Sequence, residues 1–143
     1  MDVLIKGVYW SEAKHIATPS GDIFHIMRKD VESYNGFGEV YISTVKQGAI
    51  KGWKKHTRMR LNIVVPSGSI RFVVYNPETK EKAAILISPE NYKRLTVEPG
   101  IWMAFRGESP GTSFLVNFAD IPHDPSEAES LGLDQPPVEH DWQ

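Results

Sequence analysis

The stretch GAIKGWKKHTRMRLNIVVPSG, residues 48–68, carries a run of basic side chains and one histidine up to an apolar segment. Glycines at both ends mark turns, and residues 61–65 have the branched apolar content of a buried β-strand. Because side chains alternate between the two faces of a strand, Lys54 and His56 share one face of the first half. The stretch therefore predicts two strands joined by a basic turn.

The second half of this stretch carries Arg60 and Asn62 on one face as well. If these two side chains face the same side as Lys54 and His56, the four form a cationic pocket for a phosphate and a carbonyl. The alternative is a basic rim, with His56 exposed and Asn62 bonded to a bulged backbone. Periodicity alone leaves both interpretations open.

Short β-like segments separated by turn residues recur along the chain. Turn signals such as Pro66-Ser67-Gly68 and Glu98-Pro99-Gly100 lie between them, and such spacing favours an all-β sandwich or barrel. One helical turn is expected at residues 88–93, where a serine can cap and a proline can open it. The expected strands are residues 3–9, 22–28, 39–45, 49–56, 60–65, 69–76, 83–88, 101–105 and 113–119.

Composition limits the class of protein. With 143 residues, 41% hydrophobic and 24% charged, the chain fits one globular domain. The absence of cysteine excludes a disulfide framework and a thiolate site. A net charge of −2 argues against a nucleic-acid partner. The N-terminus has an acid at position 2 and no long apolar run, so we expect a soluble, cytoplasmic protein without a membrane partner.

The C-terminal segment differs in composition from the rest of the chain. From Pro122 onward the chain holds four of its ten prolines, many acids and few large apolar residues. We therefore expect a β-barrel over residues 1–122 and an extended tail over residues 123–143. Trp142 is expected to pack on the barrel or on a partner.

Five segments, in order, resemble the dTDP-4-dehydrorhamnose 3,5-epimerase family, and most closely its short relatives that include dTDP-sugar 3,4-ketoisomerases. These segments are GDIFHIMR, GAIKGWKKH, RLNIVVPSGSIRFVVYN, ISPENYKRLTVEPGIWMAF and NFADIPHDPSE, followed by Asp141-Trp142. The resemblance implies an all-β, cupin-like jelly-roll β-barrel with a single domain. It implies binding of a dTDP-4-keto-6-deoxyhexose, isomerised by proton transfer without a cofactor in surface-polysaccharide or deoxysugar biosynthesis. It also implies a homodimer, for which residues 3–9 are the candidate pairing strand.

The spacing of the residues suggests three catalytic candidates, Lys54, His56 and Tyr41. Lys54 occupies the position of the family's basic histidine, and His56 matches a second histidine of the ketoisomerase branch. Neighbouring positive charges and burial lower a lysine pKa, so Lys54 is a candidate base or a cation on an enolate. His56 is a candidate proton shuttle, and Tyr41 or Tyr75 is a candidate acid. The alternative is that Lys54 pairs with a carboxylate such as Glu39 and takes no part in chemistry.

The candidate substrate-binding residues are Arg28, Ser43, Arg60, Asn62 and Asn117. By resemblance, the two arginines match cations around the diphosphate, Ser43 lies on the strand that faces the substrate, and Asn117 falls near the family's late-strand tyrosine. The family's supporting aspartate has no counterpart that the sequence identifies. A barrel that binds a nucleotide sugar but has lost the acid and the base is therefore the alternative function.

A metal-binding cupin is the other possibility that the motif raises. Such a site needs three or four nitrogen and oxygen ligands. His56 has a lysine where its partner histidine would stand, and residues 57–60 contain no carboxylate. We expect no metal.

Overall fold

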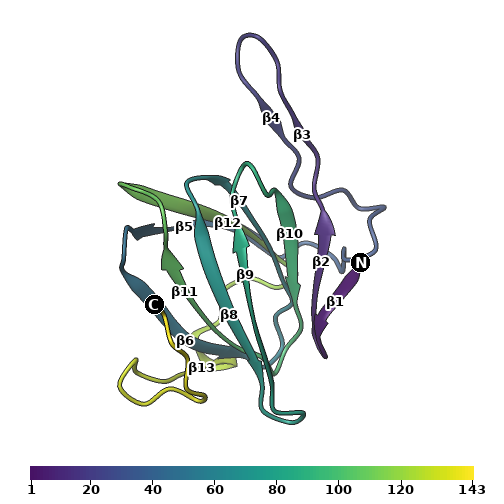
Figure 1. Cartoon of the computed structure of the whole chain (residues 1–143). Coiled ribbons are helices and arrows are strands. Elements are labelled where there is room, and N and C mark those ends of the chain that lie inside the picture. Colours follow the sequence, from purple (N-terminus) through teal and green to yellow (C-terminus); the bar gives the residue numbers. More distant parts are fainter.

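The computed structural model describes all 143 residues, and nearly all of its regular structure is β-strand (Figure 1). The one helix, η1 (Pro125–Glu127), is a three-residue 3-10 turn, and no helix has the length and apolar content to cross a membrane. The strands are β1 (Asp2–Ile5), β2 (Val8–Glu12), β3 (His15–Ile16), β4 (Ile23–Phe24), β5 (Glu39–Lys46), β6 (Ile50–His56), β7 (Leu61–Ser67), β8 (Ile70–Asn76), β9 (Glu81–Ile87), β10 (Lys93–Val97), β11 (Trp102–Gly107), β12 (Thr112–Ala119) and β13 (Ala128–Ser130).

Two antiparallel sheets face each other and form the barrel (Figure 1). The six-stranded sheet has the order β1-β2-β10-β7-β12-β5, and the five-stranded sheet has the order β13-β6-β11-β8-β9. Neighbours in both sheets are mostly distant in sequence, so the chain crosses repeatedly between the sheets, as in a jelly roll. The predicted all-β, cupin-like jelly-roll barrel is confirmed. Strands β3 and β4 form a separate hairpin that projects from the barrel (Figure 1).

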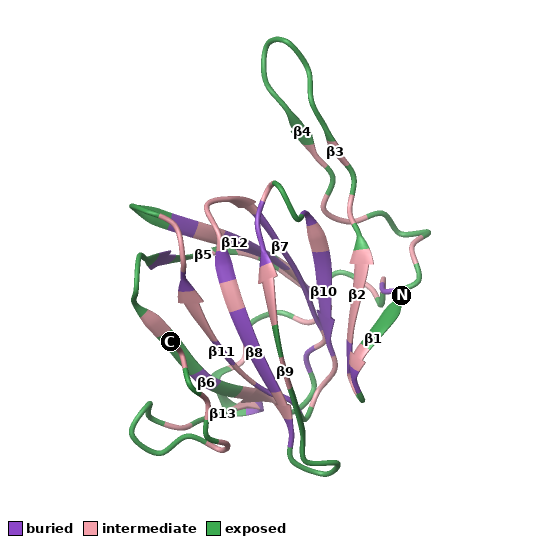
Figure 2. Ribbon diagram, in the orientation of Figure 1, coloured by how far each residue is buried: buried purple, intermediate pink, exposed green.

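The core follows from the alternation of side chains along the central strands. On β7, residues Leu61, Ile63 and Val65 point into the barrel, and Phe72 and Val74 of β8 meet them from the other sheet. Each such side chain contributes about 1.5–3 kcal/mol when it is fully buried. Figure 2 shows the buried residues concentrated on β7, β8 and β10, while the β3–β4 hairpin is exposed at its tip.

A second apolar cluster lies on the outer face of the five-stranded sheet. It centres on Trp53 and Trp102, and Leu131, Val138 and Trp142 of the C-terminal segment pack against it. Trp142 therefore packs on its own barrel, which is one of the two predicted outcomes. The C-terminal segment also pairs β13 with β6 and so extends the sheet beyond residue 122.

The predicted strands from residue 39 onward are confirmed as β5 to β9, β11 and β12, with small shifts at their ends. The single strand predicted for residues 3–9 is wrong, because Gly7, at φ +90°, closes a hairpin between β1 and β2. The strand predicted for residues 22–28 shortens to β4. The helical turn predicted for residues 88–93 is a tight turn that ends at Asn91 and leads directly into β10, a strand that the prediction missed.

A bulge in β6 decides which of its side chains face the inside of the barrel. Between the pairs Met103–Lys54 and Phe105–Lys51, β6 has one residue more than β11. A bulge of this kind redirects the side chains that follow it. Gly52 makes it sterically possible, since a Cβ there would lie 2.3 Å from the Cβ of Ala104.

Candidate functional site

A cavity of about 660 Å³ lies between the two sheets. Its volume falls within the range of about 300–1,000 Å³ that is usual for small-molecule sites. Part of the lining is apolar and includes Leu61 and Ile63 of β7 and Met103 and Phe105 of β11. The polar lining residues are Glu39, Tyr41, Ser43, Lys51, Lys54, His56, Asn117, His123 and Ser130.

The cavity brings together five of the eight residues predicted for the site. Tyr41 and Ser43 come from β5 and Asn117 from β12, all in the six-stranded sheet. Lys54 and His56 come from β6 in the opposite sheet. The predicted shared face of Lys54 and His56 is therefore present, and it looks across the cavity toward Tyr41 and Asn117.

Arg60 and Asn62 lie outside the cavity, although both were expected to face it. On β7 the cavity is lined by Leu61 and Ile63, so the alternate residues point to the other face of the sheet. The predicted face of four residues therefore does not form. The reason is that the turn at residues 57–60 separates the two strands, and alternation along one strand does not carry over to the next.

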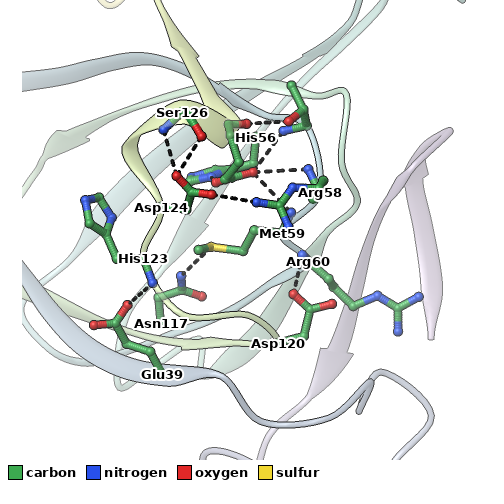
Figure 3. A network of polar contacts seen from close by, with 12 residues as sticks. Glu39, His56, Arg58, Met59, Arg60, Asn117, Asp120, His123, Asp124 and Ser126 are labelled. Atoms are coloured by element: carbon green, nitrogen blue, oxygen red, sulfur yellow. Dashed lines mark hydrogen bonds and ion pairs between the residues drawn. The ribbon is translucent and has the colours of Figure 1, made fainter.

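Asn62 and Arg60 are used in hydrogen bonding and ion pairing on that outer face. Asn62 Nδ2 donates to the carbonyl of Ser33 at 3.1 Å, and its Oδ1 accepts from Thr96 Oγ1 at 2.7 Å. The Arg60 guanidinium forms an ion pair with Glu98 at 2.7 Å. In Figure 3 the Arg60 side chain points away from Asn117.

Arg28, the remaining predicted residue, does not line the cavity either. It follows the β3–β4 hairpin, is exposed, and forms an ion pair with Asp30 at 2.7 Å. Within one chain, Arg28 therefore has no contact with a group bound between the sheets.

His56 is held by a buried carboxylate that the sequence analysis did not identify. Its Nδ1 is hydrogen bonded to Glu127 Oε1, and the second carboxylate oxygen accepts the backbone N–H groups of Thr57, Arg58 and Met59 at 3.1–3.3 Å. Because a carboxylate accepts, Nδ1 carries the hydrogen in the neutral ring. Nε2 then keeps a free lone pair, has no protein partner, and belongs to a ring that lines the cavity.

Glu127 stays ionised despite its burial. Burial acts to raise the pKa of Glu127, but the hydrogen bonds from His56 and from the backbone N–H groups outweigh it and hold the pKa below its ordinary value. Only 1% of its side chain is exposed. The carboxylate is therefore a fixed negative charge beneath the imidazole.

The segment that contains Glu127 does carry a local signal. Asp124-Pro125-Ser126 has a capping residue followed by a proline, which is the pattern of a helix start. Asp124 Oδ1 accepts the backbone N–H of Ser126 at 3.0 Å and so opens η1. The signal predicts a turn at this point, but it does not indicate that the turn lies under His56.

Lys54 does not pair with Glu39, which was the alternative considered for it. Glu39 Oε1 instead accepts the backbone N–H of His123 at 2.8 Å, and Lys54 forms no ion pair. A second lysine, Lys51, also lines the cavity because of the β6 bulge, and its Nζ donates to Ser43 Oγ at 2.8 Å. Alternation without a bulge does not place Lys51 beside Lys54.

Tyr41 and Asn117 form the polar wall opposite His56. Asn117 Nδ2 donates to Tyr41 Oη at 3.1 Å. Burial raises the pKa of Tyr41, so its phenol keeps its hydrogen at neutral pH. No three His, Asp or Glu side chains gather closely enough to share a metal ion.

We predict that Glu127→Gln destabilises the fold by about 1–3 kcal/mol, because an amide cannot accept all the hydrogen bonds that the buried carboxylate accepts. The folded-state pKa of Glu127 lies below its ordinary value of 4.5. Its stabilisation is therefore complete above that value and is lost as the pH falls through the lower, folded-state pKa. Thermal melts from pH 7 to pH 3 should show the difference between the two proteins shrinking with acidification.

The matched control for that experiment is Glu129→Gln, an exposed carboxylate that pairs only with Lys55 at 3.1 Å. Its effect should stay within about 1 kcal/mol at every pH. A Glu127→Gln difference that does not change with pH would contradict the role given to the buried charge.

Comparison with known proteins identifies the family of this chain. The family model described as "FdtA: WxcM-like, C-terminal" matches residues 6–129. The dTDP sugar isomerase of Desulfovibrio desulfuricans G20 is 30% identical, with 96% of this chain and 92% of that chain covered and a TM-score of 0.91.

Two more distant structures share the fold. NovW, a 4-keto-6-deoxy sugar epimerase from Streptomyces spheroides, is 15% identical over 99% of this chain and 77% of that chain, with a TM-score of 0.86. QdtA, a sugar 3,4-ketoisomerase from Thermoanaerobacterium thermosaccharolyticum, is 20% identical over 88% and 89%, with a TM-score of 0.75. No curated protein matches. With the family model matched over most of its length, the chain belongs to the FdtA/WxcM-like C-terminal family of cupin-like barrels.

Proposed function

We propose that the protein is a sugar-nucleotide isomerase that transfers protons beside the ketone of a dTDP-4-keto-6-deoxyhexose, as an epimerase or as a 3,4-ketoisomerase. The observation that carries this proposal is the His56 ring, fixed by Glu127 at the wall of a cavity with Nε2 unpartnered. The substrate class is supported by the 30% identical relative, which is described as a dTDP sugar isomerase.

The reaction needs one base and a group that stabilises negative oxygen. A ketone acidifies the neighbouring C–H bond, so a base near neutral pKa removes that proton and the electron pair moves to the ketone oxygen. Return of a proton to the same carbon on the opposite face gives the epimer. Return of a proton to the former carbonyl carbon, with loss of the neighbouring hydroxyl hydrogen, moves the ketone by one position.

His56 is the base in this proposal. Nε2 takes the proton, and the imidazolium that forms is stabilised by the Glu127 carboxylate at Nδ1. The same contact fixes the ring orientation, so the lone pair does not rotate away from the substrate.

Lys54 and Tyr41 are proposed to act on the substrate oxygen from opposite sheets. The Lys54 ammonium supplies a positive charge and the Tyr41 phenol a hydrogen, both suited to an enolate or to returning a proton. Ser43 and Lys51 form a second polar corner of the cavity, where a diphosphate oxygen would find a cation and a hydroxyl. Asn117, the last of the predicted binding residues in the cavity, is hydrogen bonded to the Tyr41 phenol.

Such a substrate places the protein in surface-polysaccharide or deoxysugar biosynthesis. The alternative is a barrel that binds the nucleotide sugar without reaction. The observation that favours this alternative is that a lysine, Lys54, occupies the position where the family has its basic histidine.

We also propose that the protein is a homodimer. Strand β1 is an edge strand on which Val3 is 67% exposed. The β3–β4 hairpin projects from the barrel (Figure 1), and its Ile23 is exposed. The outer face of the edge strand β5 exposes Val40 and Ile42. Exposed apolar side chains on edge strands are the usual features of a surface that pairs with another chain.

We predict that the protein exchanges a substrate proton with solvent. Incubation with dTDP-4-keto-6-deoxyglucose in heavy water, followed by proton NMR, should show loss of the signal at carbon 3 or carbon 5, or movement of the ketone to carbon 3. His56→Asn should slow the exchange by about 100-fold or more, as expected for loss of a general base. Lys54→Ala should slow it as well.

The matched control is Lys55→Ala, which removes a lysine of the same strand that pairs with Glu129 on the far side from the cavity. Its exchange rate should equal that of the unaltered protein. Line broadening without exchange would favour the binding-only barrel. Absence of both exchange and broadening would contradict the substrate class.

For the assembly, sedimentation equilibrium should give twice the chain mass of 16.1 kDa. Ile42→Glu, which puts a charge on the exposed β5 face, should shift the distribution toward the monomer if that face is in the interface. A single species at the monomer mass for the unaltered protein would rule out the homodimer.

A further inference from the structure

The orientation of the Asn117 side-chain amide is fixed by the backbone. Asn117 is fully buried, and its Oδ1 accepts the backbone N–H of Asn62 at 3.1 Å. The amide cannot be reversed, because its NH₂ group would then face another donor. Nδ2 must therefore be the atom that faces Tyr41 Oη, at 3.1 Å.

Both hydrogens of this NH₂ group have acceptors. One is donated to Tyr41 Oη, and the other points to the sulfur of Met59 at 3.9 Å, a weak acceptor. Since Asn117 offers Tyr41 only a donor, the phenol oxygen accepts at this contact. The hydroxyl hydrogen of Tyr41 must then point elsewhere.

No protein group accepts that hydrogen. Tyr41 Oη has Asn117 as its only hydrogen-bond partner, and Tyr41 lines the cavity. A phenol with its oxygen already occupied and its hydrogen free is prepared to donate to whatever enters the cavity. Because Asn117 has already oriented the Tyr41 hydroxyl, no free energy is needed to orient it when a ligand binds.

We propose that Asn117 is a positioning residue that fixes Tyr41 as a hydrogen donor toward an oxygen of the bound ligand. The chain of contacts runs from the β7 backbone at Asn62, through the Asn117 amide of β12, to the phenol on β5. The inference rests on the proposed function only for the identity of that oxygen, which is the ketone oxygen of the sugar. The arrangement of donors and acceptors stands without it.

The electrostatic surroundings agree with a neutral donor. Burial raises the pKa of Tyr41, and the charges of Glu39 and Glu127 raise it further, whereas the hydrogen bond from Asn117 acts to lower it. Removing the Asn117 donor should therefore raise the pKa of Tyr41. This shift gives a readout that does not depend on turnover.

The decisive variant is Asn117→Asp. An aspartate has nearly the same shape and still accepts from the Asn62 N–H, but its other oxygen accepts where the amide donated. The Tyr41 hydrogen would turn from the cavity to this carboxylate, and the added charge would raise the pKa of Tyr41. Tyrosine labelled with ¹³C at Cζ, with the Tyr41 resonance assigned by its loss in Tyr41→Phe, reports this pKa directly in the folded protein.

A second measurement does not depend on the folding of that variant. In the unaltered protein, the Asn117 side-chain NH₂ protons are observed by ¹H–¹⁵N NMR. In Tyr41→Phe the proton that lies on Oη loses its acceptor, so its resonance should move upfield while the backbone N–H of Asn62 stays in place. An unchanged Asn117 resonance would overturn the inference.

Steady-state kinetics complete the test. Asn117→Asp should lower kcat by about 100-fold, as for the loss of one positioned donor, with KM changed less than about threefold. An unchanged Tyr41 pKa in a folded Asn117→Asp protein would overturn the inference. If the unaltered protein turns over no substrate, the proposed function fails, and the two NMR measurements still decide the role of Asn117.

Discussion

The site depends on one buried carboxylate. Glu127 accepts three consecutive backbone N–H groups of the turn that follows β6, and it is also hydrogen bonded to the ring of His56. Unpaired N–H groups in a turn, or a buried carboxylate without donors, would each lower the stability of the fold. Here the N–H groups donate to the carboxylate, so neither is left unpaired. The same contact attaches the C-terminal segment to the barrel, since η1 leads directly into β13 and thus onto β6. Fold stability and the orientation of the candidate base therefore have a common cause.

The two sheets contribute different chemistry to the cavity. The five-stranded sheet supplies the imidazole and the two lysines of β6, which are basic and cationic groups. The six-stranded sheet supplies the neutral hydroxyl and amide groups of β5 and β12, together with the carboxylate of Glu39 on β5. A sugar bound between them would have a base on one side and donors on the other. This arrangement suits chemistry in which a proton leaves one position and a negative oxygen is stabilised meanwhile.

Alternation along single strands predicted much of this arrangement. It placed Lys54 and His56 on one face, and the turn signals located most strands of the barrel. It failed for Arg60 and Asn62, because the turn between β6 and β7 sets the second strand independently of the first. It could not place Lys51, since the β6 bulge depends on Gly52 lying against Ala104 of another strand. Glu127 was missed because it meets His56 from 71 residues away, a distance at which local patterns carry no information.

The most direct test of the account is the tautomer of His56, observed by long-range ¹H–¹⁵N correlation NMR at neutral pH. In the neutral ring, the Glu127 contact predicts that the hydrogen lies on Nδ1 and that Nε2 is unprotonated and available to a substrate. In Glu127→Gln this preference should be lost, and the ring should show a mixture of tautomers. A ring in the unaltered protein with its hydrogen on Nε2 would leave no base at the cavity wall and would contradict the central claim.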